Sequence, residues 1–505
     1  MSPPGTPVTS PAAAAPEQLR IGSRWPVIVA LMLASAVIML DNSVLNVALP
    51  TIGKELHASL AQLQWIVTAY SLTFGGLLLT TGSLSDRLGR KRVLAAGLLV
   101  MAAGSALVLL AQSAATLTAI RALAGAGAAL AMPSTLSLLY TTFRGPARQK
   151  AVGLWMSVSL AAVVLGPVLA GAMLARLSWK WLFLLNIPVA AVAVPVILAA
   201  IPESADATGE PADIPGAALS VGFMAALIYA LTGGPGYGWL SVRVLAALGT
   251  AAALAALFCW RELTARHPLL DLRTAARRAF AIPAAVEGAA YLALSAVMFI
   301  QTQLLQLVLG YTPLEAGLLL IPGIAVMAAA SGPIAKLSTR LSARSMIAAG
   351  LGTVALGTLA VAARPSSAWA IVAGMCIVVA GVRAALTTVA MEVIDALPPE
   401  RAGIGAALND TFQEIGGALG VALLGALLNQ AYRAALPAGA PAAVRGSITG
   451  AATDPAWLAA ARHAFTHGAT VAFASCATLL TLTGALAILL HRPASQPQPG
   501  KQPAS

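Results

Sequence analysis

Two long apolar runs are joined by the stretch Gly82-Ser83-Leu84-Ser85-Asp86-Arg87-Leu88-Gly89-Arg90-Lys91-Arg92-Val93. The runs, residues 63–81 and 93–115, carry no charged side chain. A helix needs about 20 apolar residues to cross the hydrocarbon core of a bilayer, so each run is long enough to span it. Short loops rich in Lys and Arg lie on the cytoplasmic side of membranes. The sequence therefore predicts a tight pair of membrane-spanning helices joined by a cytoplasmic loop.

The composition also points to a membrane protein. Of 505 residues, 59% are hydrophobic and 10% are charged, whereas soluble domains carry about 25% charged residues. The net charge is +12, but the cations lie between apolar runs rather than in one basic arm, so we expect no nucleic-acid partner. The three cysteines, Cys259, Cys376 and Cys476, lie far apart inside apolar runs, which predicts neither a metal site nor a disulfide framework.

About fourteen apolar segments are long enough to span a bilayer, which predicts an all-α polytopic membrane protein. Most of the 30 Lys and Arg residues fall in loops that are cytoplasmic when the chain begins inside, so both termini are predicted in the cytoplasm. The predicted spans cover residues 25–49, 63–81, 93–112, 117–140, 151–175, 181–201, 214–231, 244–260, 279–309, 314–335, 345–363, 368–389, 403–428 and 469–490.

The opening loop carries a family resemblance. Its pattern Gly-x-Leu-x-Asp-Arg-x-Gly-Arg-Lys resembles the signature loop between the second and third helices of the major facilitator superfamily. That resemblance implies two six-helix halves related by an axis along the membrane normal. A weaker echo runs from Gly332 to Arg344, with Lys336 in the place of Asp86. Spans seven and eight would then be the inserted helix pair of the fourteen-helix drug:proton antiporter branch.

The expected organisation has five parts. They are a disordered cytoplasmic tail at 1–24, an N-terminal six-helix half at 25–201, a linker and inserted helix pair at 202–278, a C-terminal six-helix half at 279–490 and a disordered cytoplasmic tail at 491–505. The first tail lacks the basic region and short apolar core of a cleavable signal peptide. The longest outer loop, 429–468, is compatible with either a short hairpin or a helix.

Asp41 is the first candidate for chemistry. It lies about 24 Å along the helix that begins at Trp25, at about 1.5 Å per residue. A carboxylate at that depth is costly and is a functional candidate by default. Its expected role is proton binding, cation recognition or both. The alternative is a packing residue whose polar groups are satisfied by neighbours such as Asn42, Ser43 or Asn46.

The fourth span carries a second candidate, Arg121. The run Arg121-Ala122-Leu123-Ala124-Gly125-Ala126-Gly127 resembles the family's Arg-x-x-x-Gly-x-Gly motif. Arginine does not release its proton in a protein, but it can stabilise a nearby carboxylate or hold water in a proton relay. The alternative is an arginine near the outer interface that extends its charged end to water.

The fifth span indicates export. Its run Gly166-Pro167-Val168-Leu169-Ala170-Gly171 resembles the antiporter-specific motif of the family, although Ala162 and Ala170 stand where the family has Gly. Alanine still lets helices approach closely, and Pro167 favours a kink. This motif separates antiporters from uptake members of the superfamily.

Two groups of residues are expected to control gating, one in the opening loop and one in the fifth span. Asp86 is expected at a helix N-terminus, where the helix dipole favours an anion, and Arg90 is expected to pair with a cytoplasmic acid. Such contacts would exist in one access state and break in the other. The expected gating residues are Gly82, Asp86, Arg87, Gly89, Arg90, Gly166, Pro167 and Gly171.

The thirteenth span carries two acids, Asp410 and Glu414, and resembles the corresponding helix of fourteen-helix exporters. At a spacing of i, i+4 they share a helix face. Two carboxylates so close in a low dielectric do not both ionise easily, so one is expected to hold an exchangeable proton. The alternative is a pair of ordinary acids in a wet cytoplasmic vestibule. Arg383 on the neighbouring span is a possible partner.

The ninth span has a polar and aromatic face that suits an amphipathic drug. Gln303 and Gln306 share this face, although the same amides could instead bond neighbouring helices. Glu287, about two turns inside the span, is either an intramembrane acid or an interfacial one. The expected substrate-binding residues are Asp41, Trp65, Tyr70, Phe299, Gln303, Gln306 and Phe412.

These features predict a secondary transporter, not an enzyme. It would export amphipathic, cationic or lipophilic compounds in exchange for protons, as a monomer in a bacterial cytoplasmic membrane. No phosphate-binding loop of the Gly-rich Lys-Ser/Thr type occurs, so we expect the proton gradient rather than ATP as the energy source, with no cofactor. Two alternatives stay open: a dedicated self-resistance exporter of one natural product, and a non-transporting membrane sensor on the same fold.

Overall fold

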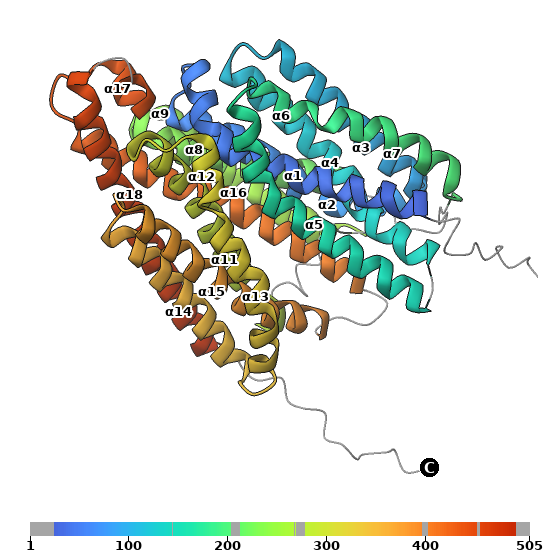
Figure 1. Ribbon diagram of the computed structural model, residues 1–505. Coiled ribbons are helices and arrows are strands. Elements are labelled where there is room, and N and C mark those ends of the chain that lie inside the picture. Colours follow the sequence, from blue (N-terminus) through green and yellow to red (C-terminus); the bar gives the residue numbers. More distant parts are fainter. Residues whose placement is uncertain are drawn as a thin grey trace, which may run out of the picture.

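A computed structural model describes residues 25–143, 145–203, 213–266, 268, 278–395, 402–451 and 455–490. The predicted tails and part of the predicted linker lie outside these residues. The described elements are helices (Figure 1): α1 Trp25–Glu55, α2 Leu60–Leu88, α3 Arg90–Leu107, η2 Val108–Leu110, α4 Ala114–Thr142, α5 Gly145–Leu174, α6 Lys180–Leu184, α7 Asn186–Ala200, α8 Ile214–Tyr237, α9 Val242–Thr264, α11 Arg278–Gln303, η3 Leu304–Val308, α12 Pro313–Leu318, α13 Ile321–Ser338, α14 Ala343–Ala363, α15 Ala368–Asp395, α16 Ala402–Ala435, α17 Ala442–Gly446, η5 Ile448–Ala451 and α18 Pro455–Leu490.

The all-helical fold with about fourteen spans is confirmed. Within the described residues, 13 helical segments are long and apolar enough to cross a membrane, and α2, with 29 residues, lies between the first two of them. The helices at the predicted long loop are longer than their apolar runs: α16 continues to Ala435 and α18 begins at Pro455. These added turns are rich in Ala, which is a strong helix former. They also contain polar residues, so a search for apolar runs does not include them in the spans.

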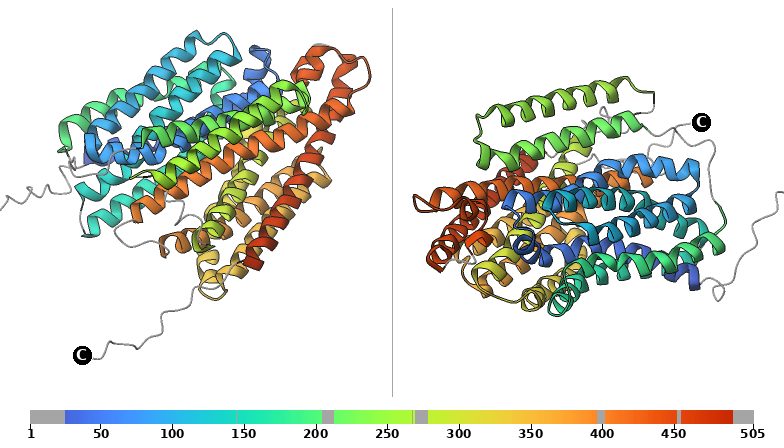
Figure 2. Two further views of the ribbon diagram at one scale, coloured as in Figure 1. Left: turned by 180° about the vertical axis from the view of Figure 1, so that it is seen from behind. Right: turned by 90° about the horizontal axis from the view of Figure 1, so that it is seen from above.

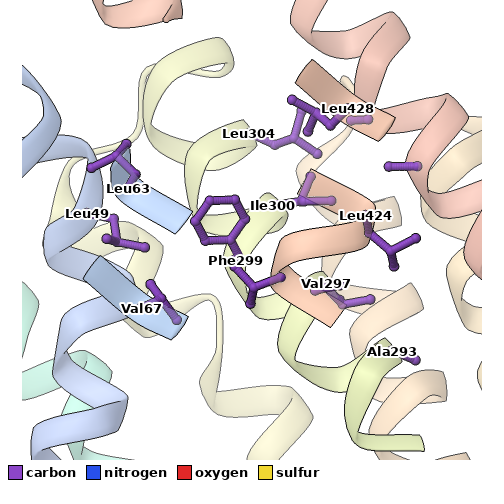
Figure 3. Close-up of a cluster of buried hydrophobic side chains, with 14 of the residues drawn as sticks. Leu49, Leu63, Val67, Ala293, Val297, Phe299, Ile300, Leu304, Leu424 and Leu428 are labelled. Atoms are coloured by element: carbon purple, nitrogen blue, oxygen red, sulfur yellow. The ribbon is translucent and has the colours of Figure 1, made fainter. Parts of the chain in front are cut away.

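The largest hydrophobic core shared by the two halves lies at one end of the bundle. We call the end with residues 82–93 the signature-loop end and the opposite end the α17 end. At the α17 end, one buried cluster unites both halves, and Figure 3 shows Leu49, Leu63 and Val67 of the N-terminal half facing Phe299 of α11. Toward the signature-loop end, a second cluster consists of N-terminal-half side chains within the described residues. There α13 and α14 diverge from the N-terminal half (Figures 1 and 2).

The inserted pair covers one seam between the halves. Helix α8 packs against both α2 and α16, where Leu72, Met224 and Ala418 form a small buried cluster. Helix α9 packs on the outer side of α8 (Figure 2). Asp213 caps α8 by accepting from the Gly216 amide at 3.0 Å, and it pairs with Arg261 of α9 at 3.1 Å. The pair is therefore tied to the halves through α8.

The signature loop is a sharp turn at Gly89. This residue has φ +101°, a backbone conformation that favours glycine, and it ends α2 and begins α3. Lys91 donates to the Ile201 carbonyl at 3.0 Å, and Arg92 pairs with Glu203 at 3.1 Å, so the start of α3 is bound to the end of α7. A Cβ at Gly89 would collide with the Glu203 carboxylate.

The expectation for Asp86 needs a correction. Asp86 lies in the last turn of α2, not at a helix N-terminus, because the helix continues past the apolar run to Leu88. The acid beside the N-terminus of α3 is instead Glu203, where the helix dipole favours a negative charge. The side chain of Asp86 lies outside the described part of the structure.

Candidate functional site

An ion pair buried in the N-terminal half joins Asp41 of α1 to Arg121 of α4. Both side chains are 1% exposed, and Arg121 Nη1 donates to Asp41 Oδ2. Asn186 of α7 donates to Asp41 Oδ1 at 3.0 Å and to Ser105 Oγ of α3 at 2.9 Å. Four helices therefore contribute to one polar cluster, and the carboxylate at its centre has the added hydrogen bond that a buried ion pair needs.

This geometry decides two alternatives that the sequence left open. Asp41 is satisfied by distant residues, Arg121 and Asn186, rather than by its neighbours along α1. Arg121 does not extend to the interface, because its side chain is completely buried. Its guanidinium lies 4.3 Å from the centre of the Tyr70 ring and 5.7 Å from that of Phe183. These ring faces attract the cation and shield it from lipid.

A second polar cluster lies in the C-terminal half. Asp410 and Glu414 lie in α16 and are partly exposed. Tyr291 of α11 lies within electrostatic range of both acids, of Glu287 and of Arg383. Arg383 donates to Ser331 of α13 at 3.1 Å. The two acids on α16 thus belong to a larger group of polar side chains from several helices.

Glu414 connects this cluster to the N-terminal half. Ser71 of α2 lies beside the Glu414 carboxyl. The approach is close, since a Cβ added to Gly75 would lie 2.7 Å from Glu414 Cβ. Tyr70, the residue before Ser71, lies within electrostatic range of Asp41, Arg121 and Glu414. Through these neighbouring residues, α2 brings the two polar clusters together.

The residues expected to bind substrate are not gathered around one open space. Phe299 is fully buried in the shared core, and Gln303 donates to the Phe299 carbonyl at 3.1 Å. Trp65 packs in the seam beside α8. Gln306 donates across the halves to the Val47 carbonyl at 2.9 Å, so it holds the α17 end together.

The other two expected substrate residues differ from each other in exposure. Phe412 of α16 is partly buried and packs against the shared core. Tyr70 is 1% exposed and lies under Arg121. Tyr70 therefore belongs to the buried Asp41–Arg121 cluster, whereas Phe412 lies at the edge of the shared core.

The antiporter-like motif of α5 lies at the interface between the halves. A Cβ added to Gly171 would lie 2.5 Å from Leu314 Cα of α12, and Gly317 of α12 lies against the Pro167 carbonyl. Gly166 faces Ser43 of α1. The motif thus lets α5 and α12 touch backbone to backbone near the α17 end. At the opposite end, the predicted gating residues occupy α2 and the start of α3, where Gly82 has open space around it and Arg87 is exposed.

Several functional candidates went unnoticed in the sequence. They include Gln64, which donates across the halves to the Val421 carbonyl at 2.8 Å, and Gln413, which donates to Glu287 Oε1 at 2.8 Å. The sequence feature that could have identified them is a polar side chain inside an apolar span, because such a side chain often forms a hydrogen bond with a neighbouring helix. The full set of overlooked residues is Gln64, Ser71, Ser105, Asn186, Gly317 and Gln413.

An apolar groove of about 520 Å³ lies between α1 and α5. It begins at Ala36 and Leu40 of α1, next to Asp41 in sequence, and includes Val158, Leu165 and Leu169 of α5. Its volume is within the range of small-molecule sites.

Comparisons with known proteins agree with this architecture. Residues 31–421 match the family model described as the Major Facilitator Superfamily. The chain is 32% identical over 390 residues to the multidrug resistance protein Stp of Mycobacterium tuberculosis (strain CDC 1551 / Oshkosh), covering 77% of this chain and 73% of that protein. It is 33% identical over 404 residues to the multidrug efflux pump LfrA of Mycolicibacterium smegmatis, covering 79% and 80%. A crystal structure of a bacterial homolog to the human lysosomal transporter Spinster has a TM-score of 0.66 at 16% identity, covering 94% of this chain and 100% of that chain.

Proposed function

Because the chain belongs to the Major Facilitator Superfamily, we propose that it exports amphipathic, cationic or lipophilic drugs across the cytoplasmic membrane in exchange for protons. One observation carries the proposal: each half holds a polar cluster within the membrane, and α2 connects them at Tyr70 and Ser71. Intramembrane acids mark substrate and proton pathways. The relatives named for multidrug efflux support the same direction of transport.

The two clusters have different parts in the proposed cycle. Asp41 is paired with a buried arginine that stays charged, so removing its charge would leave Arg121 uncompensated. Asp410 and Glu414 are partly exposed and can exchange protons with water. We therefore assign proton exchange to the C-terminal acids, and charge balance and cation recognition to Asp41. The apolar groove on α1 and α5 offers a surface for the hydrophobic part of a drug.

Rocking of the two halves gives access to opposite sides of the membrane. In this conformation the α17 end is closed by the shared core, by the bond from Gln306 to α1 and by the α5–α12 contact. By the positive-inside rule, the signature-loop end and both termini are cytoplasmic, so this conformation faces inward. Glu414 packs against α2 at Gly75 and Ser71, so protonation changes the charge at a contact between the halves and links proton binding to rocking.

A narrower substrate range is the second candidate. Some relatives are named for single antibiotics, such as the methylenomycin A resistance protein of Streptomyces coelicolor, 33% identical over 391 residues. Susceptibility of expressing cells to a chemically diverse panel separates the candidates: resistance to many lipophilic cations supports the broad pump, and resistance to one structural class supports the dedicated exporter.

Ethidium efflux tests the proposal itself. Cells that express the full chain are loaded with this fluorescent lipophilic cation and then energised, with and without a protonophore. Energy-dependent efflux that the protonophore abolishes is the expected result. The double variant Asp410→Asn with Glu414→Gln should lose this efflux, whereas Glu55→Gln, on an exposed carboxylate at the α17 end, should keep it. Efflux that persists without a proton gradient, or no transport of any panel compound, would contradict the proposal.

A further inference from the structure

A third acid lies within the membrane in the C-terminal half, on a different helix from the first two. Glu287 of α11 is 1% exposed. At about 1.5 Å per residue, it lies roughly 13 Å along α11 from Arg278, and Asp410 lies roughly 12 Å along α16 from Ala402. The two acids are therefore at similar depth, and Glu287 is the more deeply buried of them.

One hydrogen bond to Glu287 comes from Gln413, which lies between Asp410 and Glu414 along α16. Gln413, on α16, donates its amide to Glu287 Oε1 at 2.8 Å. Helices α11 and α16 lie close together near this hydrogen bond. Gly416 lies against the backbone of Gly288, and Gly420 lies against the backbone of Leu292. Such small residues let two helices approach without a side chain between them.

The charged and titratable groups near Glu287 come from three helices. In the described part of the chain, Tyr291 lies one turn after Glu287 on α11, and it is within electrostatic range of Glu287, of Asp410 and Glu414 on α16, and of Arg383 on α15. Carboxyl groups that gather around one tyrosine in a low dielectric disfavour one another's ionisation. Proton occupancy at one of these acids therefore depends on occupancy at the others.

The chemistry of Gln413 suits a group that exchanges a proton. A glutamine amide has both donors and an acceptor, so it can bond the carboxylate through its N–H and, after rotation, accept from the carboxylic acid O–H. Gln413 can therefore satisfy Glu287 in both protonation states, so that neither is left as an unpaired buried group.

We infer that Glu287 is a further proton-coupling residue and that Gln413 positions it. A carboxylate oxygen of Glu287 takes a proton from a hydronium ion, so that an O–H bond forms on Glu287 and the hydronium, losing one O–H bond, becomes water. After the halves rearrange, that bond breaks and the proton leaves to water on the other side. The inference rests on the proposed function and adds a member to its C-terminal acids.

The test uses the full chain in proteoliposomes with ethidium and an imposed pH gradient. Glu287→Gln should reduce gradient-driven accumulation about tenfold or more, within the usual size of coupling between sites. Ethidium affinity of the wild type should fall as the pH is lowered, because protons compete with the cation, and this dependence should weaken in Glu287→Gln. The control Glu55→Gln should stay within about twofold, because Glu55 is exposed and the amide oxygen of a glutamine there can still accept from Trp179 Nε1.

The outcomes separate this inference from the proposed function. A wild type without gradient-driven transport overturns the proposed function. A transporting wild type, together with a Glu287→Gln variant of unchanged rate and pH dependence, overturns the inference alone. A structural role would lower stability but leave the pH dependence in place. If Glu287→Gln does not assemble, Glu287→Asp decides: a displaced pH profile supports the inference and an unchanged profile contradicts it.

Discussion

Neutralising Asp41 should destabilise the protein, and a second change at Arg121 should restore the stability. Asn at position 41 keeps the shape of the side chain but leaves the guanidinium of Arg121, which is fully buried, without its counter-ion. Removing one partner of a buried ion pair costs about 3–5 kcal/mol. At 1.4 kcal/mol per tenfold, this corresponds to roughly a hundredfold to a few thousandfold in the equilibrium between intact and unfolded protein.

The double variant separates charge from packing. Replacing a buried ion pair by apolar or neutral side chains of similar volume is often neutral or stabilising, so Asp41→Asn with Arg121→Met should recover most of the lost stability. Asn186 can still bond an amide at position 41, since its own amide donates to Oδ1 in the native protein. Both variants should fail to transport, because the intramembrane charges are altered.

Thermal unfolding of the purified protein in detergent measures the stability, and ethidium accumulation in proteoliposomes measures the transport. The expected order of stability is wild type, double variant, then Asp41→Asn. Equal stability of Asp41→Asn and wild type would refute the buried ion pair. Full transport by the double variant would refute the functional role of the pair while leaving its structural role intact.

The contacts at the two ends give three further predictions. Gly317→Ala should push a methyl group against the Pro167 carbonyl of α5 at the closed end. Liposomes that contain this variant should leak protons, as measured with a pH dye. The control Gly332→Ala, at a position with open space around it, should not leak. Gln306→Ala removes a hydrogen bond of about 1 kcal/mol between the halves. The population with the α17 end open should therefore rise about fivefold, as measured from the distances between spin labels on α1 and α12. An unchanged distance distribution would contradict the closing role of Gln306. Arg92→Ala removes an ion pair whose arginine is 73% exposed, so thermal unfolding should register only about 0–1 kcal/mol, and a larger loss would show that Glu203 depends on this pair.

The amino-acid sequence by itself determined the class of the protein and the number of its spans. Bilayer thickness is a fixed length, so an apolar run of sufficient length identifies a span without knowledge of its neighbours. The costly intramembrane charges, Asp41, Arg121, Asp410 and Glu414, could be singled out in the same local way. The signature loop and the glycine-proline motif of α5 were also readable, since their pattern is contiguous.

Only the tertiary structure decided which of these groups meet. Asp41 contacts residues 80 and 145 positions away, and Gln306 closes one end of the molecule rather than lining an open site. Helical periodicity tells which residues share a face, but it does not tell which helix that face will meet. The order of packing around the bundle sets those partners, and it depends on the close approach of backbones at glycines such as Gly317 and Gly416. The connection of two polar clusters through α2 is therefore a property of the folded protein alone.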